Sequence, residues 1–434
     1  MKKSTLKILS LLIIIVSILS VQAWLNLPLG TTILSWIVNF LIIAIIIRFY
    51  VFNKREIVSS YISSTNNKIL EVYFFWLIIC IIRGAFIAEN YWEWKQLIIG
   101  IQSLSLPLFL YIFTVPLIAM YVLKFWFKYA IFIFVLICPF LSTVSYHFYL
   151  GPVFIVGCLI PLIPKKWMII LISLLVFMLF VDWGARSQVI KSAVVLLVAI
   201  GIYFRSYITL KMLKIAHLAC YICPIVLLIL GLSGTFNIFE GLSSNKGKYV
   251  EKKVVNGQVV EEDITADTRT FIYKEVIESA LKHNYVIWGR TPARGNDSMT
   301  FGTIQAEELK TGKYERHGNE LCHTNVFTWL GLIGLFLYSL IYLRSSYLAV
   351  YQSKNIYIKF IGCFIAFRWA YGWVEDLNNF SIMNISLWMM IAMGLSIKFR
   401  NMTNLEMKKW VQSIFKFNTK RQILYYANRN SNKH

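Results

Sequence analysis

The sequence predicts an all-α integral membrane protein with about twelve transmembrane helices and one large extracytoplasmic loop. Of its 434 residues, 58% are hydrophobic and only 15% are charged, and the mean hydropathy is +0.63. Apolar runs follow one another along the chain, and one polar block, from about 235 to 322, interrupts them. The net charge of +22 comes from short basic clusters between apolar runs, which is typical of cytoplasmic loops and not of a nucleic-acid-binding surface.

The first apolar run, within residues 1–23, is expected to be a retained transmembrane helix, although a basic start and Ala23 are also typical of a signal peptide. The span near 151–164 is short for a bilayer, and Pro161 and Pro164 are expected to break it. The other predicted spans lie near 31–51, 69–88, 97–123, 129–149, 167–181, 188–205, 213–233, 324–343, 357–375 and 380–399.

The distribution of Lys and Arg predicts the orientation. Loops on one side of the predicted bundle contain nearly all of them, whereas the short loops on the other side contain only Lys95 and Arg186. The positive-inside rule then places both termini in the cytoplasm and the polar block outside. The predicted units are 1–234 with about nine spans, 235–322 as the extracytoplasmic domain, 323–400 with about three spans, and 401–434 as a basic cytoplasmic tail.

The first part of the polar block is expected to hold a small hairpin and an amphipathic helix. Asn256 and Gly257 lie between β-branched residues, which is a strong signal for a two-residue hairpin turn. An amphipathic helix is expected to start at Asp267 or Thr268. Arg269 would lie in its first turn, where a cation opposes the helix dipole, so it either binds an anion or remains in solvent.

The second part of the block contains candidate binding residues. The segment WGRTPARGNDS places Arg290 and Arg294 in a loop with Gly and Pro, a construction that suits a diphosphate, although the arginines of an ordinary rim loop would look the same. The next span begins after Cys322 with its N-terminus facing outward, so its free N–H groups are expected to point at an external site. His323 stands at that end, either as a functional group or as a structural residue.

Charged residues near the outer ends of predicted spans complete the candidate set. A charge in hydrocarbon is costly and usually marks a polar cavity, although Arg and Lys can also extend to the interface. Lys191 lies just below the outer loop DWGARSQ. The outer candidates are Arg83, Asp182, Arg186, Arg368, Glu375 and Asp376, together with Arg316 and Glu320 in the block.

The order of these motifs resembles the O-antigen ligase and O-antigen polymerase superfamily. The likeness rests on many spans, a short outer loop such as DWGARSQ, a large outer loop that ends in an H-N-like motif, and a following GLIG helix. It covers roughly 180 to 340 by motif and the whole chain by architecture. Members take a glycan from an undecaprenyl-diphosphate donor at the outer face of the inner membrane. One departure is the sequence His323-Thr324-Asn325, in which Thr separates His from Asn.

The resemblance implies a multi-pass inner-membrane glycosyltransferase that polymerises lipid-linked repeat units for O-antigen or capsule. By position, Arg186, Arg290 and Arg294 would hold the diphosphate, and His323 would assist the acceptor hydroxyl. The alternatives are a ligase that transfers the glycan to lipid A core and, from another class, a transporter of lipid-linked sugar. The implied partners are the donor, the acceptor, membrane lipids, a chain-length regulator and a flippase, without nucleic acid.

The outer loops contain no D-x-D motif, so the expected enzyme needs neither a metal nor another cofactor. Arginines would replace the divalent cation next to the diphosphate. The further substrate-binding candidates are Arg269, Arg83, Arg368 and Arg316, and the candidates for acid or base are Glu320, Asp182, Glu375 and Asp376.

Overall fold

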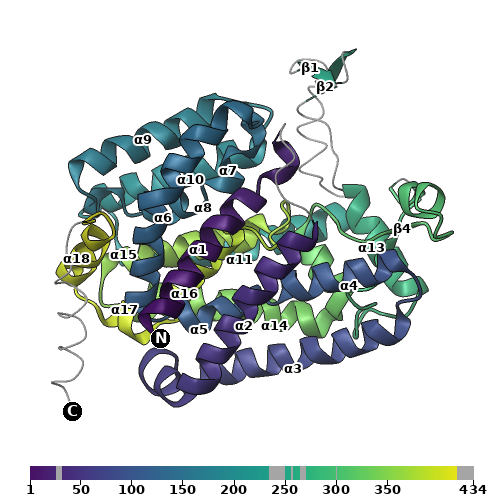
Figure 1. The fold of residues 1–434 in the computed structure, drawn as a ribbon, viewed down its shortest axis with the longest axis horizontal. Coiled ribbons are helices and arrows are strands. Elements are labelled where there is room, and N and C mark those ends of the chain that lie inside the picture. Colours follow the sequence, from purple (N-terminus) through teal and green to yellow (C-terminus); the bar gives the residue numbers. More distant parts are fainter. Residues whose placement is uncertain (26–31, 234–249, 256–257, 264–269, 300, 418–434) are drawn as a thin grey trace.

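The structure, a computed structural model, is built almost entirely of helices (Figure 1). It describes residues 1–25, 32–233, 250–255, 258–263, 270–299 and 301–417. Before the polar block the helices are α1 (Lys3–Leu19), α2 (Thr32–Glu56), α3 (Ser64–Ile87), α4 (Tyr91–Leu104), α5 (Phe109–Phe113), α6 (Pro116–Ile137), α7 (Tyr146–Tyr149), α8 (Gly151–Gly157), α9 (Lys165–Phe180), α10 (Arg186–Tyr203) and α11 (Leu210–Leu232). From the block onward they are α13 (Thr270–Lys282), α14 (Cys322–Gln352), α15 (Ile356–Tyr371), α16 (Ile382–Leu395), α17 (Ile397–Asn401) and α18 (Asn404–Ile414).

Eight helical segments among the described residues are long and apolar enough to cross a membrane. Large apolar side chains on their outer faces, such as Phe75, Phe86 and Phe132, are exposed, as expected of groups that contact lipid. The chain is therefore almost entirely helical, as predicted, and its long apolar helices could cross a membrane. The other predicted spans correspond to the shorter helices α9, α15 and α16 and to the interrupted segment around α8, so the number twelve remains a prediction. The eight segments are Lys3–Trp24, Thr32–Tyr61, Ser64–Ile87, Tyr91–Phe113, Pro116–Phe140, Arg186–Tyr203, Leu210–Gly231 and Cys322–Gln352.

The predicted spans 97–123 and 129–149 are wrong in their limits. The helical segment that begins at Tyr91 ends at Phe113, and α6 begins at Pro116. Proline lacks the N–H that an interior helical position needs and disfavours helix in the preceding residue, so the chain breaks there. As a result Lys124 and Lys128 lie inside α6 and not in a loop.

The predicted span 324–343 is also too short, because α14 has 31 residues and continues to Gln352. Arg344, expected in a loop, lies inside α14 and donates from Nε to Asn66 Oδ1 at 2.9 Å. By contrast, the segment near 151–164 is interrupted as predicted, with α8 ending at Gly157 and a 3-10 turn at 160–162.

The predicted hairpin and amphipathic helix of the polar block are both present. Strands β1 (Val250–Val255) and β2 (Gln258–Asp263) pair antiparallel, with Val255 opposite Gln258. Helix α13 packs Ile272 and Val276 against Leu321, just before α14. The predicted first turn, with Asp267, Thr268 and Arg269, lies outside the described residues.

Helix α16 forms the centre of the bundle. All 14 of its residues are buried, so other helices surround this short apolar helix on every side. It contacts α14, α15, α8 and α5. Helices α10 and α15 contact each other, and the charged residues described below lie at the ends of α10, α14 and α15.

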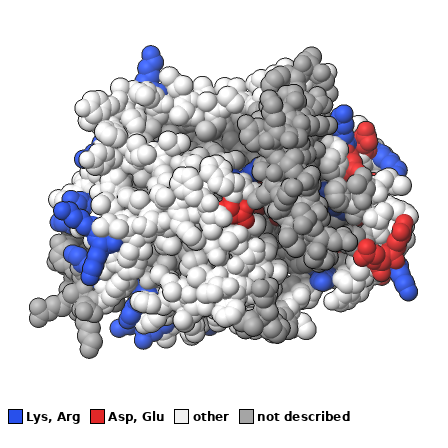
Figure 2. Space-filling model, turned by 90° about the horizontal axis from the view of Figure 1, so that it is seen from above, with Lys and Arg blue, Asp and Glu red and all other residues white. Residues whose placement is uncertain are grey.

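The polar block and the N-terminus lie at opposite ends of the helices. In Figure 1 the N-terminus, α17 and α18 are at the left, whereas α13 and β4 (Glu315–Arg316) are at the right. In Figure 2 the left end shows Lys and Arg without acidic neighbours, and the right end shows both signs. That these two ends lie on opposite sides of a membrane, as expected from the loop charges, stays a prediction.

Impermeant thiol labelling tests this sidedness. In a background without the exposed Cys223, Lys282→Cys in α13 should react with the reagent in intact spheroplasts, and Lys166→Cys in α9 should react only after the membrane is opened. Both lysines are exposed, so accessibility differs only through the membrane. Labelling of Lys166→Cys in intact cells would reverse the orientation.

Candidate functional site

The loop with Arg290 is fixed by backbone pairing with a kink in α14. Arg290 N–H donates to Thr328 O at 2.7 Å, and Leu332 N–H donates to Val286 O at 2.9 Å. The kink is at Gly331, whose φ of 69° is left-handed, and a β-carbon there would lie 2.1 Å from the carbonyl oxygen of Ile287. The GLIG segment therefore begins with the glycine that lets the loop approach the helix.

Arg290 and Arg294 are bound to carboxylates of their own domain. Arg290 contacts Asp297 Oδ1 and Glu315 Oε1, each at 2.9 Å, and Arg294 Nε donates to Glu315 Oε2 at 2.9 Å. The short strands β3 (Asn296–Asp297) and β4 pair antiparallel and bring these acids together. Both arginines thus have compensated charge, which sequence reasoning did not foresee.

Further cations surround the same carboxylates. Lys282 Nζ and His283 Nε2 each lie 2.8 Å from Asp297 Oδ2. Burial raises the pKa of Asp297, but the hydrogen bonds from Lys282, His283 and Arg290 outweigh burial and lower it to about 2. Asp297 is therefore a permanent anion at neutral pH.

Arg83 meets Arg290 and Arg294 at an open cleft of 520 Å³. Arg83 donates from Nη1 to Trp288 O at 2.8 Å and from Nη2 to Gly289 O at 3.2 Å, so it also ties α3 to the loop. The structure therefore brings three of the predicted binding arginines together. A second cleft of 590 Å³ shares His283, Arg290 and Arg294 with the first.

A second group of charged residues is buried between α10, α15 and the loop that follows α15. Lys191 Nζ lies 2.5 Å from Glu375 Oε1, and Arg368 Nη1 lies 3.0 Å from Glu375 Oε2. The side chain of Lys191 is 1% exposed and that of Arg368 is 2% exposed. Ser187, one turn before Lys191, donates to the same carboxylate. We call Lys191, Arg368, Glu375 and Ser187 the Glu375 cluster.

The cations determine the charge of Glu375. Burial alone raises the pKa of this carboxyl, but Lys191 and Arg368 outweigh burial and lower it to about 2. Two cations and one anion leave the Glu375 cluster with a net positive charge. The sequence analysis noted Lys191 only as a charge below the DWGARSQ loop and missed Ser187. The available signal was a lysine in an otherwise apolar run, with Ser187 one helical turn before it.

The loop DWGARSQ leads directly into this cluster. Asp182 accepts hydrogen bonds from Thr143 Oγ1 at 2.9 Å and from Ala185 N–H at 3.2 Å, so it shapes the turn. Arg186 is the first residue of α10 and is exposed. Within the described part of the chain no carboxylate forms an ion pair with it, so Arg186 is the free cation next to the Glu375 cluster.

Asp376 points toward α14 instead. Its Oδ1 accepts from Asn378 N–H at 2.8 Å and from Asn325 Nδ2 at 3.4 Å. Among the described residues no donor reaches Oδ2. Burial raises the pKa of Asp376 to about 6, although the residue keeps partial exposure. This combination is typical of a carboxylate that accepts protons near neutral pH.

A chain of asparagines connects Asp376 to the arginine cleft. Asn325 Oδ1 accepts from Asn319 N–H at 2.6 Å, and Asn325 Nδ2 donates to Asn319 O at 2.9 Å. Asn319 Nδ2 in turn donates to Asn296 Oδ1 at 2.9 Å, next to Asp297. Asn325 of the H-T-N sequence is therefore a positioning residue between the two charged groups.

His323 lies in the first turn of α14, as predicted, but its side chain is only 1% exposed. Its Nε2 lies 2.9 Å from the carbonyl oxygen of Trp369, which can only accept, so Nε2 carries the proton. The ring packs against Trp369 and Trp373 with centroid distances of 5.2 and 4.5 Å. Nδ1 is buried and has no hydrogen-bond partner in the described structure.

The first N–H groups of α14 are not free, which corrects the expectation that they face a ligand. Cys322 N–H donates to Gly372 O at 3.0 Å and to Glu375 O at 2.9 Å. His323 N–H also points to Gly372 O, at 3.4 Å. The loop after α15 therefore caps this helix end.

The other candidates lie at the rim of the domain. Arg316 packs over the ring of Phe301 at 4.4 Å and lies 3.5 Å from Glu320, whose side chain is 60% exposed. Arg269 lies outside the described residues. No group of three or more His, Cys, Asp or Glu that could hold a metal ion occurs among the residues that were described.

The described residues thus form a polar region at the end opposite the N-terminus, with the arginine cleft and the Glu375 cluster as its two parts. No protein-family model, no curated protein and no solved structure matches the chain.

Proposed function

We propose that the protein is a membrane glycosyltransferase that polymerises undecaprenyl-diphosphate-linked oligosaccharide repeat units at the outer face of the inner membrane. The observation that most supports this proposal is the Glu375 cluster, a net positive group at the ends of apolar helices beside the exposed Arg186. A substrate with an anionic headgroup and a lipid chain would place its diphosphate at this depth while the chain stays in the bilayer. The resemblance of the motifs to the O-antigen superfamily adds the reaction type.

In the proposed reaction an acceptor hydroxyl attacks the anomeric carbon of the donor. The bond from that carbon to the diphosphate oxygen breaks, and undecaprenyl diphosphate leaves with the additional negative charge. Arg186 would bind this leaving group, with Lys191 and Arg368 behind it. Each charge-assisted hydrogen bond contributes about 1.5–3 kcal/mol, and a cation that is fixed before the reaction needs no reorganisation.

The acceptor hydroxyl must lose its proton, and Asp376 fits this role better than His323. Asp376 keeps partial exposure, and no donor among the described residues reaches its Oδ2; its raised pKa of about 6 leaves it ionised at neutral pH but still basic. His323 Nδ1 is the other acceptor in the region, but the ring is enclosed by Trp369 and Trp373. That His323 is the general base stays a prediction, as an alternative to Asp376.

The ligase uses the same donor, and nothing in the polar region identifies the acceptor. A transporter of lipid-linked sugar is a second candidate, because buried ion pairs such as those of the Glu375 cluster also occur in proton-coupled transporters. The polar groups inside the helical bundle favour a role in helix packing over a role in transport. Asn39 Nδ2 donates to Gln102 Oε1 at 2.9 Å, and His217 Nε2 and Tyr221 Oη lie 3.0 and 2.9 Å from Ser346 Oγ, so these groups join neighbouring helices. Gln102 Nε2 and His217 Nδ1 have no hydrogen-bond partner among the described residues.

Arg186→Lys tests whether a guanidinium holds the diphosphate. The purified protein with lipid-linked donor should keep its activity in excess EDTA, and Arg186→Lys should lose most of it because Lys cannot form a bidentate contact. Arg290→Lys should also lose activity, partly by loosening Asp297 and Glu315.

The matched control is Arg205→Lys, an exposed arginine at the other end of α10, which should leave the rate unchanged. A requirement for Mg²⁺ or Mn²⁺, or full activity of Arg186→Lys, would count against arginine binding of the diphosphate.

A further inference from the structure

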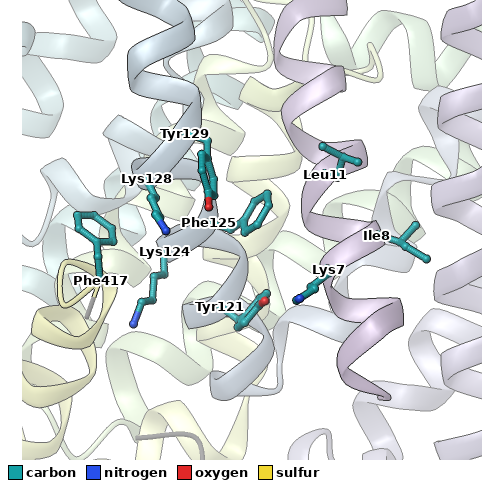
Figure 3. Close-up of a pocket in the computed structure, with 9 residues that line it drawn as sticks. All are labelled: Lys7, Ile8, Leu11, Tyr121, Lys124, Phe125, Lys128, Tyr129 and Phe417. Atoms are coloured by element: carbon teal, nitrogen blue, oxygen red, sulfur yellow. The ribbon is translucent and has the colours of Figure 1, made fainter. Parts of the chain in front are cut away.

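A basic cleft lies between α1 and α6, at the end of the molecule opposite the polar region (Figure 3). Its volume is 420 Å³. Three lysines and two tyrosines form one part of its lining, and apolar side chains form the rest. The basic and polar residues are Lys7, Lys124, Lys128, Tyr121 and Tyr129, and the apolar residues are Ile8, Leu11, Phe125 and Phe417.

The three lysines form no ion pair in the part of the chain that the structure describes. Among the described residues no carboxylate lies within ion-pair distance of Lys7, Lys124 or Lys128. The C-terminal segment 418–434, which follows Phe417 of the lining, contains no Asp or Glu in its sequence. Lys124 and Lys128 are also one helical turn apart, a spacing at which like charges repel. An anion from outside the chain would relieve this repulsion.

The depth of the lysines makes an anionic ligand more favourable still. Lys124 and Lys128 lie about 12 and 18 Å along the α6 axis from Pro116, at about 1.5 Å per residue. The start of α6 is held by the amphipathic helix α18, because Trp410 Nε1 donates to Pro116 O at 2.9 Å. The segment Pro116–Phe140 is long and apolar enough to cross a membrane, so both lysines lie within this segment and not at its end.

The direction of the Lys124 and Lys128 side chains fits a position within an apolar segment. In Figure 3 the chains of Lys124 and Lys128 both extend toward the end of α1 at which Lys7 lies. Such a direction carries the ammonium groups toward the interface. The Lys128 ammonium lies 4.9 Å from the centroid of the Tyr129 ring, and Lys7 and the Tyr121 ring line the same cleft from the side of α1 and the start of α6.

We propose that this cleft binds the phosphate of an anionic phospholipid from the leaflet on the side of the N-terminus. The ammonium groups and the tyrosine hydroxyls would hold the phosphate, and an acyl chain would lie along Ile8, Leu11 and Phe125. Ile8 and Leu11 are 53% and 52% exposed, as expected of a surface that lipid covers. An anionic inner leaflet and this basic cleft have complementary charge. The site is independent of the proposed transferase reaction.

Lipid titration of the purified, delipidated protein in neutral detergent tests the site. Native mass spectrometry should show phosphatidylglycerol bound in preference to phosphatidylcholine. Lys124→Gln/Lys128→Gln removes two charges and should lower the affinity for phosphatidylglycerol about thirtyfold. Glycerol phosphate at millimolar concentration should not displace the lipid, because the acyl chain contributes to binding; displacement would mean that the cleft takes free phosphate esters instead.

Two further variants keep the test decisive. Lys165→Gln/Lys166→Gln removes the same charge from exposed lysines at the start of α9 and should bind as the parent does. Lys124→Arg/Lys128→Arg keeps the charge and should retain binding, which separates a charge effect from misfolding. Equal losses in the α6 and α9 double glutamine variants would show nonspecific attraction and overturn the proposal. So would parent-like affinity of Lys124→Gln/Lys128→Gln.

Discussion

Replacement of Glu375 by glutamine is expected to lower the free energy of unfolding by about 3 to 5 kcal/mol, because it leaves two buried cations without their anion. Lys191 and Arg368 both point at this carboxylate and are almost fully buried. Titration with sodium dodecyl sulfate, followed by circular dichroism, measures the change. Glu320→Gln is the matched control, since Glu320 is 60% exposed and its ion pair contributes little.

Two outcomes separate the ion-pair account from a general loss of packing. Lys191→Met in the Glu375→Gln background should recover part of the stability, since it removes one of the uncompensated charges. A Glu375→Gln protein as stable as the parent would contradict the account.

The pH dependence has a definite sign. The pKa of Glu375 is about 2 in the folded chain and about 4.3 in an unfolded one, so its contribution is complete above about pH 5 and is lost as the pH falls toward 2.

Asp376→Asn is expected to lower kcat by a factor of about 10² to 10⁴ with KM nearly unchanged, because the amide cannot accept the hydroxyl proton. The shape is nearly the same, and the amide can still accept from Asn378 N–H. In the parent protein the activity should fall as the pH drops below about 6, where Asp376 becomes protonated. The pH profile of kcat with purified protein and lipid-linked donor measures both effects.

His323→Asn provides the comparison for that variant. Asn can cap a helix start, so a His323 that only supports the start of α14 should be replaceable with activity within about tenfold of the parent. If His323→Asn loses two orders of magnitude while Asp376→Asn stays active, the base is His323 Nδ1 and not Asp376.

Local signals in the sequence were sufficient to predict the hairpin and the amphipathic helix of the polar block. Asn256 and Gly257, which themselves lie outside the described residues, predicted the antiparallel pair β1 and β2, and the apolar stripe with Ile272 and Val276 predicted α13. The basic loops and the polar block predicted that the N-terminus and the polar block would lie at opposite ends of the molecule. Pro116 is a sequence signal for the break before α6. Because the residues on both sides of it are apolar, the predicted span nevertheless ran across the break.

The charged partners could not be predicted, because they are distant in the chain. Glu375 meets Lys191 across 184 positions, and Arg294 meets Glu315 only after β3 and β4 pair. Periodicity reports which face of a helix is buried, but it does not report which other helix covers that face. For this reason the sequence indicated the arginines as diphosphate ligands without showing that Arg290 and Arg294 already bind carboxylates.

The most direct test of the proposed transfer follows both products of the reaction. The purified protein is reconstituted in liposomes with an undecaprenyl-diphosphate-linked repeat unit, and the lipids are separated by mass spectrometry. The proposal predicts lipid-linked dimers and longer oligomers, with one undecaprenyl diphosphate released for each bond formed and neither product in the Asp376→Asn protein. Donor that remains intact but moves from one leaflet to the other would contradict a transferase and identify a transporter.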